Sequence, residues 1–338
     1  MRIAYDVTPL SHPRTGVGNY ILGALKGMVE ARSGDELVVF GPVSIRGRSL
    51  LDDALAGVDV ERKLATVPFA HATRRAWGAL GHPAAERLVG DFDVLHFTDW
   101  MRPPQRQGLR ATMIHDLGPL RFPERLHPRT VNMHTANARE AQRCDVVFVN
   151  SAFTGRDVVE RLGISRERIR VAYPGVASIF TADGPNEFTD PFVFSTATDS
   201  WRKNGENLRR ACELIGANWP LIMPNRDGQF SEDSIARLYR GATVFVYPSR
   251  FEGFGMPVVE AMASGAPCVV SSHPSLDEAC GEAAIRVDPE SPRAIADGIL
   301  EAHERRDELV SLGLAHASAF TWAATGRAHL RGYADALA

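Results

Sequence analysis

One stretch near residue 250 limits the folds open to this chain more than any other. Residues 242–247 form a β-rich run that Pro248 should end, which predicts a buried strand. Residues 256–264 carry apolar side chains at helical spacing, with Pro257 suited to the first turn and Gly265 placed to stop the helix. The stretch therefore predicts a strand, a glycine-rich turn and a helix in that order.

The turn between this strand and this helix has the chemistry of a binding site. Gly253 and Gly255 let the backbone approach a ligand, and the helix that follows presents unpaired N–H groups to a phosphate or a sugar oxygen. Glu252 lies in the turn and Glu260 lies inside the helix, so their carboxylates can accept hydrogen bonds from two parts of one ligand. The alternative is a tight connection with one solvated glutamate.

The same residues resemble a known family. Glu252 to Ala263, Gly265, Pro267, Val269 and Val270 follow the signature E-G-F-G-x-P-x-x-E-A-M-A-x-G-x-P-V-V of the family 4 (GT4) retaining glycosyltransferases, with Cys268 where the family usually has valine. The resemblance implies an α/β protein of GT-B fold, with two Rossmann-like domains facing a cleft. It also implies transfer of a hexose, of mannose or glucose type, from a nucleoside-diphosphate sugar to a hydroxyl acceptor with retention of configuration.

Length and composition agree with this family. A chain of 338 residues can form two α/β domains, and a net charge of −3 gives no reason to expect a nucleic-acid partner. The four cysteines form no C-x-x-C pair and are expected to be reduced thiols. No apolar run reaches ~18 residues and no signal-peptide pattern opens the chain, so we expect a cytoplasmic protein.

The N-terminal half begins with an expected strand at 2–6, a loop containing Gly16 and Gly18, and a helix to about residue 29. A dinucleotide fingerprint would need glycine where Ile21 stands, and the expected strand at 36–41 lacks a closing acidic residue, which disfavours an NAD oxidoreductase. The resemblance places Gly16 and Gly18 in an acceptor and phosphate loop at the cleft. The alternative is a plain tight turn.

Two further strands are expected at 93–97 and 111–116, and each delivers a histidine near its carboxyl end, where ligands of parallel sheets gather. His115, followed by Asp116 and Pro119, resembles the family's H-D-x-x-P loop, whose histidine reaches the donor sugar. We expect His96 to be structural.

The second domain is expected to open with a strand at 191–196. Arg202, Lys203 and Asn204 then resemble the family's R-K-N element, in which cations neutralise the donor diphosphate. The resemblance implies catalytic roles for Glu252, His115 and Lys203. The expected donor-binding residues are Arg202, Lys203, Gly253, Phe254, Gly255, Met256, Pro257 and Glu260, with Glu260 on the ribose hydroxyls.

Three other segments complete the prediction. Residues 73–89 have a helical pattern, and a basic, partly aromatic cluster there and on a strand near 58–67 is either solvated or a peripheral contact with the inner membrane face. Its members are Arg62, Lys63, Arg74, Arg75 and Trp77. Only about twenty residues lie between 223 and 243, where the family usually has a longer segment. Either the pocket for the nucleotide base is abbreviated, or residues are missing from the sequence.

We expect domains at 1–176 and 177–319, with a C-terminal helix at 320–338 that returns to the first domain. Asp91 and Asp93 spell a D-x-D motif, but they precede a strand, at the end opposite to the ligand site, so we expect no metal and no cofactor. The donor is expected to be a nucleotide sugar, and the acceptor a glycan, a lipid-linked sugar or a small molecule. Alternatives are a non-catalytic sugar-nucleotide-binding protein and a nucleoside-diphosphate-sugar epimerase of the same fold.

Overall fold

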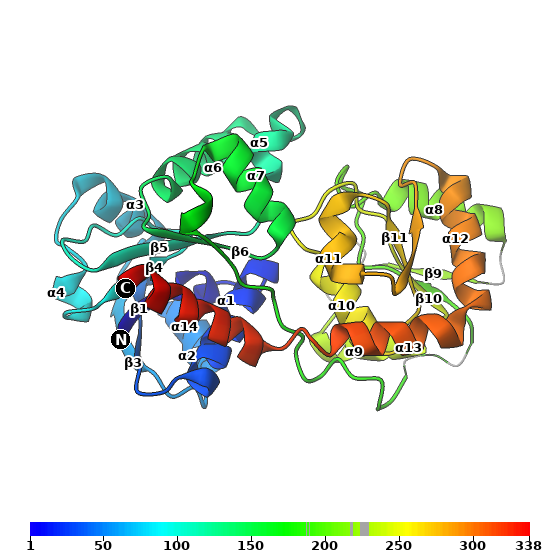
Figure 1. Cartoon of the computed structure of the whole chain (residues 1–338), viewed down its shortest axis with the longest axis horizontal. Helices are drawn as coiled ribbons and strands as arrows, with labels where there is room; N and C mark the ends of the chain where they lie inside the picture. The colour runs from blue at the N-terminus through cyan, green and yellow to red at the C-terminus, as the bar shows by residue number, and fades with distance from the viewer. Residues whose placement is uncertain (187, 189, 217–218, 224–229) are drawn as a thin grey trace. The chain divides into compact units, whose positions relative to one another are not determined.

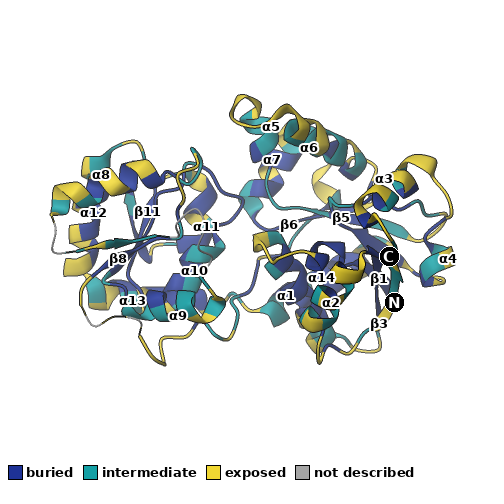
Figure 2. Ribbon diagram, turned by 180° about the vertical axis from the view of Figure 1, so that it is seen from behind, coloured by how far each residue is buried: buried dark blue, intermediate teal, exposed yellow. Residues whose placement is uncertain are grey.

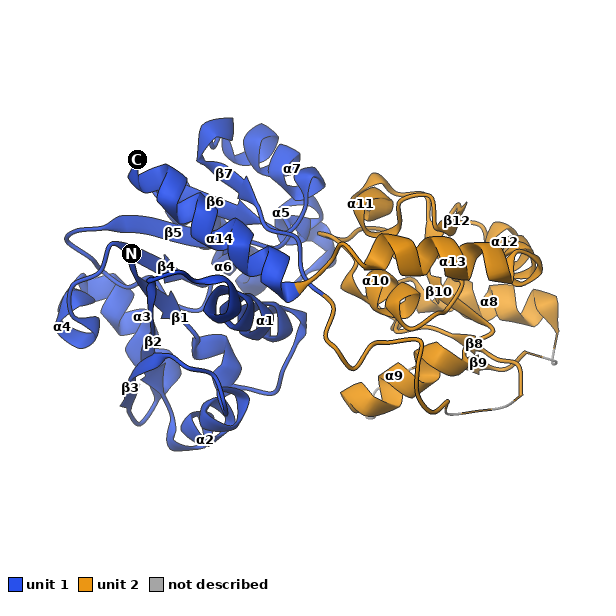
Figure 3. Cartoon of the chain, turned by 60° about the horizontal axis from the view of Figure 1, so that its bottom comes forward, with its two compact units in different colours: residues 1–175, 322–338 blue, residues 176–321 orange. Residues whose placement is uncertain are grey.

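The computed structural model describes residues 1–186, 188, 190–216, 219–223 and 230–338. The chain divides into two compact units (Figure 3). Unit 1 contains Met1–Gly175 and Trp322–Ala338, and unit 2 contains Val176–Thr321. The chain therefore leaves unit 1 one residue before the expected boundary at 176, and the C-terminal segment belongs to unit 1.

Unit 1 is built on a seven-stranded sheet in which every pairing is parallel. The strands are β1 (Arg2–Asp6), β2 (Glu36–Val43), β3 (Glu61–Thr66), β4 (Val94–Phe97), β5 (Leu109–Ile114), β6 (Val146–Val149) and β7 (Ile169–Val171). Their order is β3-β2-β1-β4-β5-β6-β7, so the chain runs outward in both directions from the neighbouring strands β1 and β4. This is the doubly wound Rossmann-like topology that was expected.

Helices cover both faces of this sheet (Figure 1). The helices of unit 1 are α1 (Gly16–Ala31), α2 (Ile45–Ala54), α3 (Ala70–Leu80), α4 (Glu86–Val89), α5 (Gly118–Arg121), α6 (Pro128–Ala141), α7 (Ala152–Leu162) and α14 (Trp322–Leu337). Short 3₁₀ turns lie at η1 (Thr8–Ser11), η2 (Pro123–Arg125) and η3 (Arg166–Arg168). Ser151 caps α7, because its hydroxyl accepts a hydrogen bond from the Thr154 N–H at 2.9 Å.

Alternate residues of the central strand β1 pack on opposite faces of the sheet, which is the period-two pattern of a sheet covered on both faces. Ile3 and Tyr5 of β1 pack in the core beneath α1 and α14, whereas Ala4 packs on the other face with Trp77 of α3. The central strands are accordingly buried, whereas the edge strand β3 and the outer faces of the helices are largely exposed or half-buried (Figure 2). The sheet residues therefore serve the core, and ligand chemistry is left to the loops at its edges.

Close glycine contacts join α14 to α1. A Cβ on Gly27 would lie 1.8 Å from the carbonyl oxygen of Trp322, and a Cβ on Gly326 would lie 2.0 Å from the backbone of Gly27. A Cβ on Gly23 would enter the Trp322 ring. Only residues without a side chain allow the two helices this approach, which seats the buried Tyr333 of α14 in the core of unit 1.

Unit 2 is built on a second all-parallel sheet, with five strands in the order β12-β11-β10-β8-β9. The strands are β8 (Val193–Phe194), β9 (Leu221–Ile222), β10 (Val244–Tyr247), β11 (Cys268–Ser271) and β12 (Ala284–Val287). The helices are α8 (Gly205–Ile215), α9 (Glu232–Gly241), α10 (Met256–Ala263), α11 (Asp277–Cys280), α12 (Pro292–Glu304) and α13 (Arg306–Ala317), with a 3₁₀ turn η4 (Pro274–Leu276). Strand, turn and helix around residue 250 thus form as predicted.

The structure corrects two expectations for unit 1. Gly16 and Gly18 lie in the first turn of α1, not in a loop before it, because Thr15 caps the helix and accepts a hydrogen bond from the Gly18 N–H. The helical pattern at 73–89 is split into α3 and α4, because Gly81 adopts a left-handed conformation that ends α3 and Pro83 follows.

The shortened segment in unit 2 leads from β9 directly to α9 in the described residues. Residues 224–229, which fall inside the stretch where an abbreviated base pocket or missing residues were considered, lie outside the described part. Ser231 caps α9 by accepting a hydrogen bond from the Ser234 N–H at 3.1 Å.

Candidate active site

The second sheet reverses its strand order between β8 and β10, and the loops that follow these two strands carry the predicted donor-site residues. The loop after β8 holds Arg202 and Lys203, and the loop after β10 holds Glu252. Ligands of open α/β sheets bind at such a switch point, because adjacent loops diverge there and leave a crevice. The fold therefore gathers these three residues where a ligand is expected.

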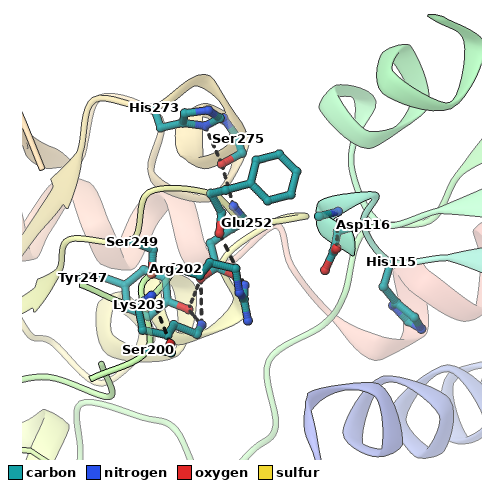
Figure 4. Close-up of polar contacts among 12 residues, drawn as sticks. His115, Asp116, Ser200, Arg202, Lys203, Tyr247, Ser249, Glu252, His273 and Ser275 are labelled. Carbon is teal, nitrogen blue, oxygen red and sulfur yellow. Dashed lines mark hydrogen bonds and ion pairs between the residues drawn. The ribbon is translucent and has the colours of Figure 1, made fainter. Parts of the chain in front are cut away.

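Glu252 is the centre of this cluster (Figure 4). Lys203 Nζ donates to Glu252 Oε1 at 2.7 Å, and Arg202 Nη1 donates to Glu252 Oε2 at 2.6 Å. Lys203 Nζ also contacts the Tyr247 hydroxyl, which in turn donates to Glu252 Oε1 at 3.0 Å. Two cations thus converge on one buried carboxylate.

The opposite charges of the cluster keep one another ionised. Burial alone would raise the pKa of Glu252, but the positive charges of Lys203 and Arg202 outweigh it and hold that pKa below its usual range. Burial would likewise lower the pKa of Lys203, and the charge of Glu252 reverses the shift and raises it. Glu252 and Lys203 are therefore both ionised at neutral pH.

Backbone geometry holds the two loops in place. Asn204 adopts a left-handed conformation, with φ of 61°, and its amide donates to the carbonyl oxygens of Pro248 at 3.1 Å and Pro289 at 2.7 Å. The Arg250 N–H donates to the Arg202 carbonyl at 2.8 Å. Because Asn204 directly follows Lys203, these bonds fix where the lysine side chain begins.

The glycine turn has the close approach that the sequence predicts. Gly255 has φ of 104° and caps α10, and a Cβ there would lie 2.5 Å from a methyl carbon of Leu276. The Glu252 N–H donates to the Ser275 hydroxyl at 3.0 Å. Phe254 is buried and packs against Phe320, so it can serve a ligand only through its backbone. Met256 and Pro257 are half-buried at the start of α10.

Glu260 lies in α10, away from the paired cations. Burial raises the pKa of Glu260 to about 7. The Tyr239 hydroxyl, which donates a hydrogen bond to Oε2 at 3.3 Å, lowers this pKa but does not outweigh the effect of burial. A carboxylate poised near neutrality can accept hydrogen bonds from a diol when it is ionised. Its role on a ribose remains a prediction.

His115 follows β5 in unit 1, as predicted, and with Asp116 it lines a cavity of about 120 Å³. Burial lowers the pKa of His115 to about 4, so its imidazole is neutral. The Asp116 carboxylate accepts a hydrogen bond from the Gly118 N–H at 2.7 Å, which fixes the loop. His96 is buried within β4, 2.7 Å from the Tyr333 hydroxyl, in the structural position expected of it.

The D-x-D motif lies before β4, as expected. Asp93 accepts a hydrogen bond from the Arg2 N–H at 2.7 Å, and Asp91 accepts one from the Gln107 amide at 3.2 Å. In the described parts of the chain, no group of three His, Cys, Asp or Glu side chains is arranged to hold a metal ion.

The basic residues that were expected to form one surface cluster do not lie together on the surface. Arg74 and Trp77 are buried in unit 1, and Arg62 and Lys63 lie on β3 in ion pairs with Asp52 and Glu61. A strand and a helix that are close in sequence do not place their side chains on a common face. Among the described helices, none has the length and apolar character to cross a membrane.

Sequence reasoning missed Tyr247 and Ser275, which contact Glu252. Tyr247 is the last residue of β10, so its position at the carboxyl end of a central strand was an available signal. Ser275 comes from a turn more than twenty residues further along the chain, and only the fold brings it to the cluster.

Two family models of glycosyltransferases match this chain. The family model described as Glycosyltransferase Family 4 matches residues 14–178, and the model described as Glycosyl transferases group 1 matches residues 221–305. The chain belongs to the family 4 glycosyltransferases.

Curated relatives match nearly the whole chain. O-antigen chain mannosyltransferase B of Escherichia coli is 26% identical over 376 residues, which cover 95% of this chain and 96% of the relative. A D-inositol 3-phosphate glycosyltransferase of Nocardia farcinica is 25% identical over 401 residues, covering 99% and 89%. Both alignments are longer than the 338 residues of this chain, so both contain gaps in it.

A solved structure shares the fold. HepE of Anabaena, in complex with UDP-glucose, superposes with a TM-score of 0.70 at 14% identity and covers 97% of each chain. The expected GT-B fold, with its two Rossmann-like domains, is confirmed.

Proposed function

We propose that this protein transfers a hexose from a nucleoside-diphosphate sugar to a hydroxyl acceptor with retention of anomeric configuration. Membership of the family establishes glycosyl transfer in general. The single observation that supports the donor class is the convergence of Lys203 and Arg202 on Glu252 at the switch point of the second sheet. Two adjacent cations beside a glycine turn match the charge of a diphosphate.

The Lys203–Arg202–Glu252 arrangement can bind the donor while keeping its own contacts. An ionised carboxylate offers about four acceptor positions, so Glu252 can keep its cations and still accept a hydrogen bond from a sugar hydroxyl. Lys203 and Arg202 have further N–H donors for phosphate oxygens. The site therefore meets sugar and diphosphate with one preorganised set of charges.

In the proposed reaction the bond between the anomeric carbon and the diphosphate oxygen breaks, and the acceptor oxygen bonds to the same face. The departing phosphate takes the acceptor proton, and the Lys203 and Arg202 cations stabilise the negative charge that develops on the diphosphate. Such electrostatic stabilisation is usually the largest catalytic term. The resemblance also assigns a catalytic role to His115, whose imidazole is neutral.

The proposed donor sugar is of mannose or glucose type, and the acceptor is a glycan, a lipid-linked sugar or a small molecule. The named relatives support this range, since one is a mannosyltransferase of an O-antigen chain and another a glycosyltransferase named for an inositol phosphate.

The test begins with a thermal-shift screen of GDP-, UDP-, ADP- and dTDP-sugars, because a ligand at 100 times its Kd stabilises by about 2.7 kcal/mol. The donor that binds is then assayed for release of nucleoside diphosphate with and without candidate acceptors. Acceptor-dependent release supports transfer. Binding without release would support a non-catalytic binder, and conversion of the sugar without an acceptor would support an epimerase.

Metal independence is a further part of the proposal, because Lys203 and Arg202 supply positive charge without a cation. Turnover should survive excess EDTA. Asp91→Ala should keep most activity and Lys203→Ala should lose most of it. Activity abolished by EDTA and restored by Mn²⁺ would contradict this assignment of charge.

A further inference from the structure

Unit 1 contains a second cavity, larger than the one beside His115. Its volume is about 930 Å³, and residues of α3, of the loop after β4 and of α6 line it. We call it the arginine pocket, after Arg74 and Arg75 of α3, Arg102 of the β4 loop and Arg129 of α6. All its residues lie in unit 1, so it is distinct from the Lys203 cluster.

The topology makes this a ligand position. The first sheet reverses its order between β1 and β4, and the pocket takes residues from beyond the carboxyl ends of both, His12 after β1 and Trp100 after β4. Crevices that bind ligands form at such switch points. In unit 2 the same relation holds for the Lys203 cluster. Each sheet thus places its charged loops at its own switch point.

The charge of the pocket is unbalanced. Four guanidinium groups line it against a single carboxylate, that of Asp99. Over the described residues, none of the four arginines forms an ion pair with a carboxylate, and Arg102 bonds instead to the amide oxygen of Asn137 at 2.6 Å. Many other arginines do form ion pairs, as Arg110 does with Glu140 at 2.6 Å. The imbalance favours an anionic ligand.

Arg74 is the built part of this site. Its side chain is 1% exposed, yet its Nε has no hydrogen-bond partner, and Nη1 reaches only the Pro42 carbonyl at 3.4 Å. The guanidinium lies 5.4 Å from the centre of the Trp100 ring. The Asp6 carboxylate acts on this charge electrostatically, but no hydrogen bond or ion pair joins it to Arg74 in the described part of the chain. Burying a charge without a directly paired anion is costly, and a bound anion would compensate it.

The pocket also has a connection to the reaction. Asp99 lines both the arginine pocket and the smaller cavity that contains His115 and Asp116. A ligand whose anionic group lies among the arginines can therefore extend past Asp99 toward His115. Met133, which is 46% exposed, and Trp100 provide apolar surface for the body of that ligand.

We propose that the arginine pocket binds a phosphate group of the acceptor, so the acceptor is a phosphorylated sugar or a sugar carried on a lipid diphosphate. The identification of the bound phosphate compound as the acceptor rests on the proposed glycosyl transfer. The anion site itself rests only on unit 1. Arg74, Arg75 and Arg129 hold the phosphate, and the sugar hydroxyl that is to be glycosylated points past Asp99.

Arginine labelling tests the site directly. Arg75 and Arg129 are exposed and react with phenylglyoxal, and peptide mass spectrometry reads each residue separately. Inorganic phosphate and pyrophosphate should protect both residues, by about tenfold at ten times the Kd. Arg139, exposed on the same helix but outside the pocket, is the internal control, and sodium chloride at equal ionic strength controls for screening.

In the variants Arg74→Gln and Arg129→Ala, phosphate should no longer protect Arg75 from phenylglyoxal. In the control variant Arg139→Ala, phosphate should still protect Arg75. Arg129 is exposed, so Arg129→Ala tests the proposal even if Arg74→Gln fails to fold. With the acceptor found by the activity screen, Arg129→Ala should raise the acceptor KM by about tenfold or more, the loss of one charge-assisted bond. Its Kd for the donor nucleotide should be unchanged.

Vesicles separate the two sources of phosphate. A lipid-linked acceptor is assigned if phosphatidylglycerol vesicles protect Arg75 and Arg129 at a lower phosphate concentration than free phosphate requires. Vesicles of phosphatidylcholine alone should then give no protection. Protection by free phosphate without vesicle protection assigns a soluble sugar phosphate. Labelling of Arg75 and Arg129 that falls no more than that of Arg139 with any of these probes would overturn the proposal. Failure of the donor screen would instead remove only the proposed function.

Discussion

At the scale of single residues, Glu252 and Glu260 show how environment separates two carboxylates in one strand-turn-helix unit. Glu252 is ionised because two cations contact it, and its pKa is held low. Glu260 has only the Tyr239 hydroxyl as a described hydrogen-bond partner, and burial raises its pKa to about 7. The two glutamates should therefore respond differently to substitution.

Glutamine substitutions should separate their roles. Glu260→Gln should weaken binding of the donor's nucleoside diphosphate by about tenfold or more, because a charged acceptor for the ribose hydroxyls is lost. Glu252→Gln should bind the nucleotide at least as tightly, since Lys203 and Arg202 lose a competing anion, and should lower kcat. Calorimetry and steady-state kinetics measure both. Unchanged nucleotide affinity in Glu260→Gln would contradict the assignment.

The raised pKa of Glu260 also predicts a pH-dependent stability. Its folded pKa of about 7 exceeds the ordinary value of 4.5, so the protonated form stabilises the fold at low pH, and that stability is lost as the pH rises through 7. Glu260→Gln should therefore melt a few degrees above the wild type at pH 8, with the difference shrinking toward pH 5. A Tm difference that is constant from pH 5 to pH 8 would exclude this shift.

At the scale of elements, α1 and α14 depend on glycine at their crossing. Gly326→Ala places a methyl group where the backbone of Gly27 lies 2.0 Å away, so the helices must separate. We expect a loss of about 1–3 kcal/mol, typical of overpacking. Gly16→Ala is the matched stability control, since it lies on α1 with nothing within 4 Å of the new methyl group. Urea unfolding that gives both variants equal midpoints would contradict the close packing.

Elements also show where sequence reasoning ended. The helical pattern at 73–89 continues through Gly81, whose left-handed conformation ends α3. Gly16 and Gly18 were placed in a loop, although a threonine cap begins α1 directly before them. In both cases a local glycine or capping signal was present, but periodicity alone does not locate helix ends.

At the scale of the whole molecule, the two units differ in how the chain builds them. Unit 2 is one continuous segment, while unit 1 needs the separate segment Trp322–Ala338, which supplies Leu330 and Tyr333 to its core. The chain passes between the units at two points that lie close together, since the Val176 N–H donates to the Phe320 carbonyl at 2.9 Å.

This connectivity predicts how fragments fold. Residues 176–321 should unfold cooperatively on their own, whereas residues 1–175 should not, because without α14 the apolar surface around Phe148 is exposed. Joining 1–175 to 322–338 through a short glycine-serine linker should restore cooperative unfolding. Circular dichroism during urea titration measures all three. Equal midpoints for 1–175 with and without the joined helix would contradict the prediction.

The sequence by itself determined the family, the two α/β domains and the strand-turn-helix unit that carries Glu252, because hydrophobic periodicity and glycine turns are local properties of the chain. It also placed Lys203 and His115 next to carboxyl ends of strands. Only the tertiary structure decided that Lys203, Arg202 and Tyr247 contact one carboxylate, and that Arg74 is buried in a pocket with Trp100 and Arg129. Strand order and helix packing bring such residues together from distant parts of the chain, and nothing in their local sequence records that proximity.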